Sequence, residues 1–254
     1  YFIMNNFNYS FVEFKQSGFV PQKPAKTISS KLGDCKDFST LFATLGRKAG
    51  LDVNLVLILT SEYGKQSLML PSQDFNHCIV KVKLDGEEQF LELTDKNMPF
   101  KSVPNSLLNA TALEIPFMSN TNKKYSLFNL GEMKGVKSNN ISNVTLKIDT
   151  NKVQNLAVNS HISGSLASAY FSIFSGRNYE LIKKDIDNDF RGRIGDLVLD
   201  TITNISAEKG QNFVSYDTKI QIKDKMNEIA DLVPIDFNKI VESKEKFIPK
   251  FKQV

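Results

Sequence analysis

The dipeptide Asp85-Gly86 constrains the fold of this chain most strongly, because Asp-Gly is favoured in two-residue hairpin turns. The segments on its two sides, residues 77–84 and 89–94, alternate between apolar and polar side chains as half-buried strands do. If Leu84 pairs with Glu87, the register of the hairpin is fixed along its length. The sequence therefore predicts two antiparallel strands joined by a tight turn.

This register brings two titratable side chains close together. His77 and Glu92 become diagonal neighbours on one face of the hairpin, with backbones about 7–8 Å apart, which long side chains can bridge. Asp95 has the wrong parity for this face unless the strand ends or bulges before it. The hairpin thus predicts an imidazole beside a carboxylate.

A helix is predicted upstream of the hairpin, with Gly50 as the left-handed residue at its end. Asp34 is a suitable N-cap, and Asp37 three positions later can complete a capping box. Cys35 then falls at about the first helical position, where free backbone N–H groups and the helix dipole favour a thiolate. The apolar residues that define the buried face are Phe38, Leu41, Phe42, Leu45 and Ala49.

The second cysteine, Cys78, has a different expected environment. By strand alternation it points away from His77, together with Val80 and Val82, and we expect a buried thiol without a chemical role. A Cys35–Cys78 disulfide is the alternative in an oxidising compartment. The hairpin parity argues against it, because Cys78 and His77 should not both face the cysteine helix.

Three segments resemble the transglutaminase-like superfamily of papain-related thiol enzymes: Gly-Asp-Cys-Lys-Asp at 33–37, and residues 70–77 and 90–100. Residues 18–25 also match the loop that precedes the cysteine helix in these proteins. The likeness is greatest to large bacterial envelope proteins, in which such a core stands between two β-rich domains. The resemblance implies an α+β fold with a papain/transglutaminase-like core, in which the cysteine helix packs on an antiparallel sheet.

The resemblance also implies roles for individual residues. Cys35 occupies the position of the nucleophile, and His77 that of the general base and acid. The third position, usually an aspartate, is Glu92 here, with Asp95 as the fallback. A side chain upstream of the cysteine normally completes the oxyanion hole, and Tyr9 is our candidate for it.

The function expected from these residues is acyl transfer or hydrolysis on peptide amide bonds, through a triad and a thioester intermediate. The alternative is a catalytically inactive scaffold that binds a peptide or glycan at the bacterial cell envelope. The loop over residues 60–75 precedes the histidine, and binding residues concentrate on such connections. Its Ser61, Tyr63 and Gln66 are candidate substrate contacts.

Composition excludes several other classes of protein. The chain has 254 residues, of which 41% are hydrophobic, and its net charge of +4 is too balanced for nucleic-acid binding. No apolar run approaches the roughly 20 residues needed to span a bilayer. Two cysteines and two histidines give no metal-site spacing, and no phosphate-binding glycine loop is present, so we expect neither metal nor cofactor. His161 is expected on a solvated strand face.

Between residues 116 and 140 the composition shifts to Asn, Ser, Lys and Gly, which predicts a domain boundary. We expect a thiol-enzyme core over 1–132 and a smaller mixed α/β, β-rich domain of unknown role over 133–254. The periodicity of the second domain predicts strands over 144–148, 156–162 and 214–222, and helices over 166–174 (ending at Gly176) and near 193–203.

The expected partner is a peptide or protein substrate. The chain begins within a segment that already resembles the superfamily, so we expect it to be part of a longer multidomain protein. By resemblance to the envelope proteins, its expected location is periplasmic or extracellular.

Overall fold

The structure is a computed structural model, and it describes residues 2–10, 20–63, 74–116, 125, 127–130, 138–150, 153–208 and 210–222. The chain divides into two compact units, and the protein is α+β with antiparallel sheets. The first unit comprises Tyr1–Ser138 and Ser163–Ser168, and the second comprises Asn139–Ile162 and Ala169–Val254. The domain limits expected from the sequence, 1–132 and 133–254, stay a prediction.

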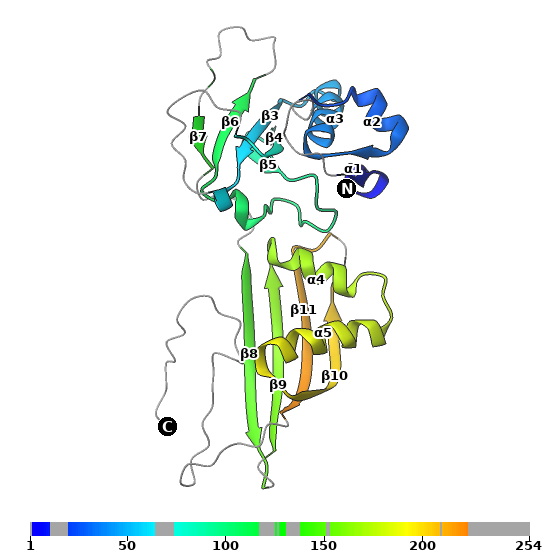
Figure 1. Ribbon diagram of the computed structural model, residues 1–254, viewed down its shortest axis with the longest axis vertical. Coiled ribbons are helices and arrows are strands. Elements are labelled where there is room, and N and C mark those ends of the chain that lie inside the picture. Colours follow the sequence, from blue (N-terminus) through cyan, green and yellow to red (C-terminus); the bar gives the residue numbers. More distant parts are fainter. Residues whose placement is uncertain are drawn as a thin grey trace. The chain divides into compact units, whose positions relative to one another are not determined.

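A five-stranded sheet forms the centre of the first unit, and each strand is antiparallel to its neighbours (Figure 1). The strand order is β5-β4-β3-β6-β7. The strands are β3 (Val53–Leu59), β4 (His77–Leu84), β5 (Glu87–Leu91), β6 (Thr111–Ile115) and β7 (Leu127–Asn129).

The helix predicted upstream of the hairpin is α3 (Cys35–Lys48), and it packs on one face of this sheet. Apolar residues of α3 meet those of β3 and β4 there, including the fully buried Leu41 and Val82. The opposite face carries a second core with Val56 and Ile79. Shorter elements surround these layers: α1 (Phe2–Asn6), β1 (Asn8–Tyr9), α2 (Pro24–Ser30), β2 (Leu32–Gly33), η2 (Ser61–Tyr63) and η3 (Asn105–Leu107).

The local predictions for the helix and the hairpin are confirmed. Asp34 caps α3, its capping box with Asp37 is complete, and Gly50 has a φ of 86°. In the hairpin turn, Asp85 and Gly86 both have positive φ, as a type I′ turn requires. Strand pairing follows the predicted register from Leu84↔Glu87 to Val80↔Leu91, although β5 ends at Leu91 rather than at residue 94.

The expectation that Cys78 and His77 would not both face the cysteine helix was wrong. Cys78 is buried, as expected, but Ser39 on α3 donates its hydroxyl to the Cys78 backbone carbonyl at 3.1 Å. Val80 and Val82, which share its strand face, also pack against α3. His77 stands at the first position of β4, where the sheet no longer confines its side chain, so strand parity did not decide which face it reaches.

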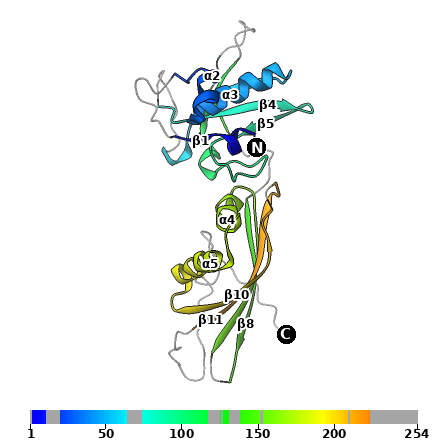
Figure 2. The ribbon, with the colours of Figure 1, turned by 90° about the vertical axis from the view of Figure 1, so that its right-hand side faces the viewer.

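The second unit contains a four-stranded sheet in the order β10-β11-β9-β8, with helices on one of its faces (Figure 2). The Tyr216 ring of β11 lies 5.1 Å from the Phe174 ring of α4, centroid to centroid. The strands are β8 (Asn139–Ile148), β9 (Gln154–Ser163), β10 (Leu197–Ser206) and β11 (Phe213–Ile222), and the helices are α4 (Leu166–Phe174) and α5 (Tyr179–Ile194).

The helix expected near residues 193–203 was a wrong prediction, because β10 occupies most of that segment and α5 precedes it. The register of β10 against β11 shifts between Leu199 and Thr201. This irregularity puts Leu199 and Ile202 on the buried face, three residues apart. Apolar residues three positions apart are also typical of a helix, and this spacing explains the wrong prediction. His161 is half-buried on β9, and its ring stacks on Phe213.

Candidate active site

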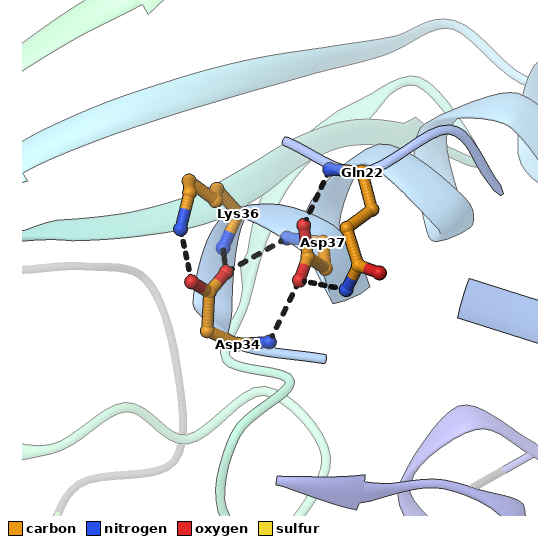
Figure 3. A network of polar contacts seen from close by, with 4 residues as sticks. All are labelled: Gln22, Asp34, Lys36 and Asp37. Atoms are coloured by element: carbon orange, nitrogen blue, oxygen red, sulfur yellow. Dashed lines mark hydrogen bonds and ion pairs between the residues drawn. The ribbon is translucent and has the colours of Figure 1, made fainter. Parts of the chain in front are cut away.

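Cys35 is the first residue of α3, and its neighbours Asp34, Lys36 and Asp37 form a network of polar contacts at the start of that helix (Figure 3). Asp34 Oδ1 accepts hydrogen bonds from the backbone N–H groups of Lys36 and Asp37, at 3.1 and 3.2 Å. Asp37 Oδ2 in return accepts the N–H of Asp34 at 3.1 Å. Because the residues on both sides of Cys35 take part in this capping box, the nucleophile position has little freedom to move.

A second layer of contacts fixes the segment before α3. Gln22 donates its backbone N–H to Asp37 Oδ1 at 2.7 Å and its side-chain amide to Asp37 Oδ2 at 2.8 Å (Figure 3). The buried Lys36 ammonium forms an ion pair with Asp34. Asp37 therefore joins the helix start to the loop that precedes α2.

His77 lies between a thiol and a carboxylate. Its Nε2 is 2.6 Å from Glu92 Oε2, and a hydrogen bond with the side chain of Cys35 is among the influences on its pKa. Burial lowers the pKa of His77, but the hydrogen bonds to Cys35 and Glu92 and the negative charge of both residues raise it more, to about 10. The structure thus places Cys35, His77 and Glu92 in one chain of contacts.

Glu92 is almost completely buried, and its charge is compensated by three hydrogen bonds. Burial raises the pKa of this carboxyl, but the bond and charge of His77 and two bonds from Thr94 lower it below its usual range. The Thr94 N–H and hydroxyl each donate to Glu92 Oε1 at 2.7 Å. An ionised Glu92 is therefore the stable form beside His77.

The pairing of two short strands places Tyr9 beside Cys35. The two-residue strands β1 and β2 pair in parallel, with Tyr9 opposite Gly33. The Tyr9 hydroxyl hydrogen-bonds the backbone of Cys35, and its ring packs edge-on against Phe38. Burial and the nearby negative charge of Cys35 raise the pKa of Tyr9, so its hydroxyl keeps its proton at neutral pH.

Residues 1–92 match the family model described as the transglutaminase-like superfamily. Over these residues the chain is similar to that superfamily. Cys35, His77 and Glu92 all lie within the matched transglutaminase-like segment, and Glu92 is its last residue.

Comparison with whole proteins adds a distant similarity. No curated protein matches the chain. A similar solved structure is described as "a putative protease from Parabacteroides distasonis", with 10% sequence identity and a TM-score of 0.38. The match covers 88% of this chain and 44% of that protein, so the chain spans less than half of its length.

The other candidates named from the sequence lie apart from the transglutaminase-like triad. Asp95 Oδ1 accepts the N–H of Asn97, and Asp95 Oδ2 accepts the hydroxyl of Ser168, so the fallback carboxylate is engaged elsewhere. Ser61 donates its hydroxyl to a backbone carbonyl, and Tyr63 is exposed. Gln66 lies outside the described residues. The role of these three loop residues in substrate binding stays a prediction.

Both cysteines are free thiols, which removes the disulfide alternative. Burial and the negative charge of Cys35 raise the pKa of Cys78, so Cys78 stays protonated at neutral pH. Among the residues that the structure describes, no group of three or more His, Cys, Asp or Glu side chains could hold a metal ion. No helix in the described part is long and apolar enough to cross a membrane.

A cavity of about 460 Å³ is lined in part by Tyr9 and Thr94, whereas Cys35, His77 and Glu92 are not among its lining residues. Two of its wall residues contact the triad, since Tyr9 bonds the Cys35 backbone and Thr94 bonds Glu92. Buried apolar side chains form part of the wall, and polar residues form the rest. The lining residues are Met4, Phe7, Asn8, Tyr9, Phe38, Leu93, Thr94, Asp95, Lys96 and Asn97.

Sequence reasoning missed the contacts that support the site. Thr94 was noticed only as part of a strand, although a threonine two residues after a carboxylate can bond it locally. The capping box was predicted, but Gln22 as a second partner of Asp37 was not. No sequence pattern pointed to Gln22, because its contact with Asp37 spans 15 residues.

Proposed function

We propose that this chain is a transglutaminase-like thiol enzyme that transfers the acyl group of a peptide amide through Cys35, His77 and Glu92. The observation that carries the proposal is the position of His77, which bonds Cys35 on one side and Glu92 on the other. A nucleophile, a base and a group that orients the base, each within hydrogen-bond reach of the next, are the parts that covalent catalysis needs.

In the first step, the Cys35 sulfur attacks the carbonyl carbon of the amide. The C–S bond forms, the carbonyl electrons move onto oxygen, and a tetrahedral intermediate results. The attacking form of a cysteine is its thiolate. The raised pKa of His77, about 10, keeps its ring protonated at neutral pH, ready to act as the proton donor. His77 then gives its proton to the leaving nitrogen as the C–N bond breaks, which releases an amine and leaves a thioester on Cys35.

The negative oxygen of the intermediate needs hydrogen-bond donors. The Tyr9 oxygen lies against the Cys35 backbone N–H, so an oxygen bound beside them could receive the Tyr9 O–H, and the Cys35 N–H as well once that N–H is released from Tyr9. This geometry supports Tyr9 as the oxyanion donor. Removing one such donor typically slows acyl transfer by about 10²–10³.

In the second step, the thioester is released to water or to an amine. His77, now neutral, takes a proton from the incoming water or amine as its oxygen or nitrogen attacks the thioester carbon. The C–S bond breaks, and the thiolate–imidazolium pair is restored. Water gives a peptidase or amidase, and an amine gives a transamidase.

The cavity beside Tyr9 and Thr94 supports a substrate with a sizeable side chain near the reacting carbonyl. Its volume of about 460 Å³ lies within the range of ligand-binding pockets. Peptides or proteins of the bacterial envelope are the substrates we propose, in a periplasmic or extracellular location. That compartment, and membership of a longer multidomain protein, rest on the family resemblance.

The second candidate is an inactive scaffold that binds a peptide or glycan in the same cavity. The observation in its favour is the burial of the nucleophile, because Cys35 is only 3% exposed. Protein atoms that cover the Cys35 sulfur would have to move before a substrate carbonyl could reach it. A binding module would need no such movement.

Mass spectrometry of a peptide mixture distinguishes these functions. The protein and its Cys35→Ala variant are each incubated with a tryptic digest of casein, with and without dansylcadaverine. New peptide ends mean a peptidase, loss of ammonia from glutamine means an amidase, and dansyl adducts mean a transamidase. The proposal requires at least one product that depends on Cys35. Peptides retained equally by both proteins without any product would instead support the scaffold.

A further inference from the structure

We infer that Thr94 is a positioning residue, which fixes the Glu92 carboxylate against His77 and so allows a glutamate to serve at this position. The inference rests on the proposed function for its catalytic meaning, whereas the contacts themselves are properties of the folded chain. Thr94 is not expected to touch the reacting atoms.

The carboxylate of Glu92 divides its two oxygens between two partners. Oε2 faces His77 Nε2 at 2.6 Å, and Oε1 accepts both the backbone N–H and the hydroxyl of Thr94, each at 2.7 Å. The side chain of Glu92 is 1% exposed. Water therefore has little access to the carboxylate, and its hydrogen bonds come from the protein.

The end of strand β5 makes this arrangement possible. β5 stops at Leu91, so Glu92 and the two residues after it lie outside the sheet ladder. The Thr94 N–H is then free of strand pairing and points back to the carboxylate two residues earlier. A strand that continued to residue 94, as the sequence predicted, would have used such backbone groups for pairing instead.

The extra methylene of glutamate explains why a fixing contact is needed. A glutamate side chain has one more rotatable bond than aspartate, and holding it in one conformation costs side-chain entropy that opposes folding. Two hydrogen bonds from a residue two positions away restrict that freedom. They keep Oε2 directed at His77.

The same bonds influence charge as well as position. Hydrogen bonds from Thr94 are among the causes that lower the pKa of Glu92, and an ionised Glu92 helps to raise the pKa of His77. The titratable groups that act on His77 are Cys35 and Glu92. Loss of the Thr94 hydroxyl should therefore change the pKa of His77, although the hydroxyl contacts Glu92 and acts on His77 only through it.

The test is an NMR titration of the His77 ring in the full chain. The protein has two histidines, so its ring spectrum is simple, and the loss of one signal in His77→Gln assigns it. Thr94→Val keeps the branched shape and the N–H but removes the hydroxyl. Thr94→Ser keeps the hydroxyl and removes the methyl group. Thr94→Ala is the substitute if the valine variant does not fold.

We expect Thr94→Val to lower the pKa of His77 by about half a unit to one unit, because a Glu92 carboxylate released from the Thr94 hydroxyl no longer keeps Oε2 at 2.6 Å from His77 Nε2. Thr94→Ser should stay close to the wild-type value. Equal values in all three proteins, or an equal drop in the serine and valine variants, would overturn the inference and leave Thr94 as a packing residue.

Turnover separates this inference from the proposed function. If the casein assay finds a Cys35-dependent product, Thr94→Val should reduce kcat about three- to tenfold, and Thr94→Ser should restore most of it. An unchanged kcat in Thr94→Val would count against positioning. If no product is found, the proposed function fails, and the His77 titration still decides whether Thr94 fixes Glu92.

Discussion

The length of the Glu92 side chain matters because its two oxygens serve different partners. Oε2 contacts His77, and Oε1 accepts hydrogen bonds from Thr94. In the resembling proteins this position usually holds an aspartate, so a substitution toward that residue would conventionally be expected to improve the site. The contacts of this chain lead to the opposite expectation.

We predict that Glu92→Asp weakens the contact with His77, because a carboxylate one methylene shorter cannot reach both His77 and Thr94. The pKa of His77 should fall from about 10 toward its ordinary value of 6.5. NMR titration of the ring measures this change, and Glu92→Gln, which keeps the length but loses the charge, is the matched control. A pKa that stays the same or rises in Glu92→Asp would contradict this account.

For individual residues, the sequence predicted that His77 and Glu92 lie close together but not the contacts that fix them, and the catalytic roles of the site residues stay a prediction. Cys35, His77 and Glu92 follow from a capping pattern, a hairpin register and a family resemblance, all of which are local. Gln22 and Thr94 act through contacts whose geometry depends on where a loop passes or a strand ends. Single-sequence patterns do not fix those points to within one residue.

Among the elements, the close packing of β2 against α3 sets the position of Tyr9. A Cβ atom on Gly33 would lie 2.8 Å from the Asp37 Cβ and 2.9 Å from the Phe38 ring. No side chain fits there without a shift of the helix start. The Gly33 carbonyl also accepts the N–H of Ser10, which ties β1 to the same place.

Gly33→Ala should therefore destabilise the fold by about 1–3 kcal/mol, as overpacking generally does. Gly192→Ala is the control, because that glycine lies within α5 with no atom near its added methyl group. The control should raise the free energy of unfolding by about 0.5–1 kcal/mol. Urea unfolding followed by circular dichroism measures both, and a neutral Gly33→Ala would refute the packing argument.

Helices and strands whose ends are marked by nearby residues were predicted well. Strands whose position depends on pairing with distant parts of the chain were predicted poorly. The α3 helix and the hairpin each have explicit start and turn residues, and both were predicted. The parallel pairing of β1 with β2 joins residues far apart in the sequence and is too short to leave a pattern. The irregular register of β10 produced helical spacing in a strand.

For the whole molecule, the triad links stability to pH. The pKa of His77 is raised from 6.5 to about 10, so the folded state holds this proton more tightly than the unfolded chain. Its contribution to stability is fully present below about pH 6.5 and is lost as the pH rises through about 10. Glu92 has a lowered pKa, so its contribution is present above its ordinary value of 4.5 and is lost in acid.

We predict that the unfolding free energy of the wild type, relative to His77→Gln, decreases by up to about 1.4 kcal/mol per pH unit between pH 7 and pH 10. Comparison with the variant cancels the titration of groups that do not interact with His77. Urea unfolding at a series of pH values measures the difference. A difference that does not depend on pH in this range would show that His77 holds no extra proton in the folded state.

The central claim is that His77 activates Cys35, and the alkylation rate of Cys35 by iodoacetamide tests it most directly. Rates are measured between about pH 5 and pH 10 in the wild type and in His77→Gln, and peptide mass spectrometry separates Cys35 from Cys78. We predict that near pH 6 Cys35 reacts at least about tenfold faster in the wild type, while Cys78, whose raised pKa keeps its thiol protonated, stays unreactive in both proteins. Equal rates with and without His77 would contradict the claim and leave the site as a binding scaffold.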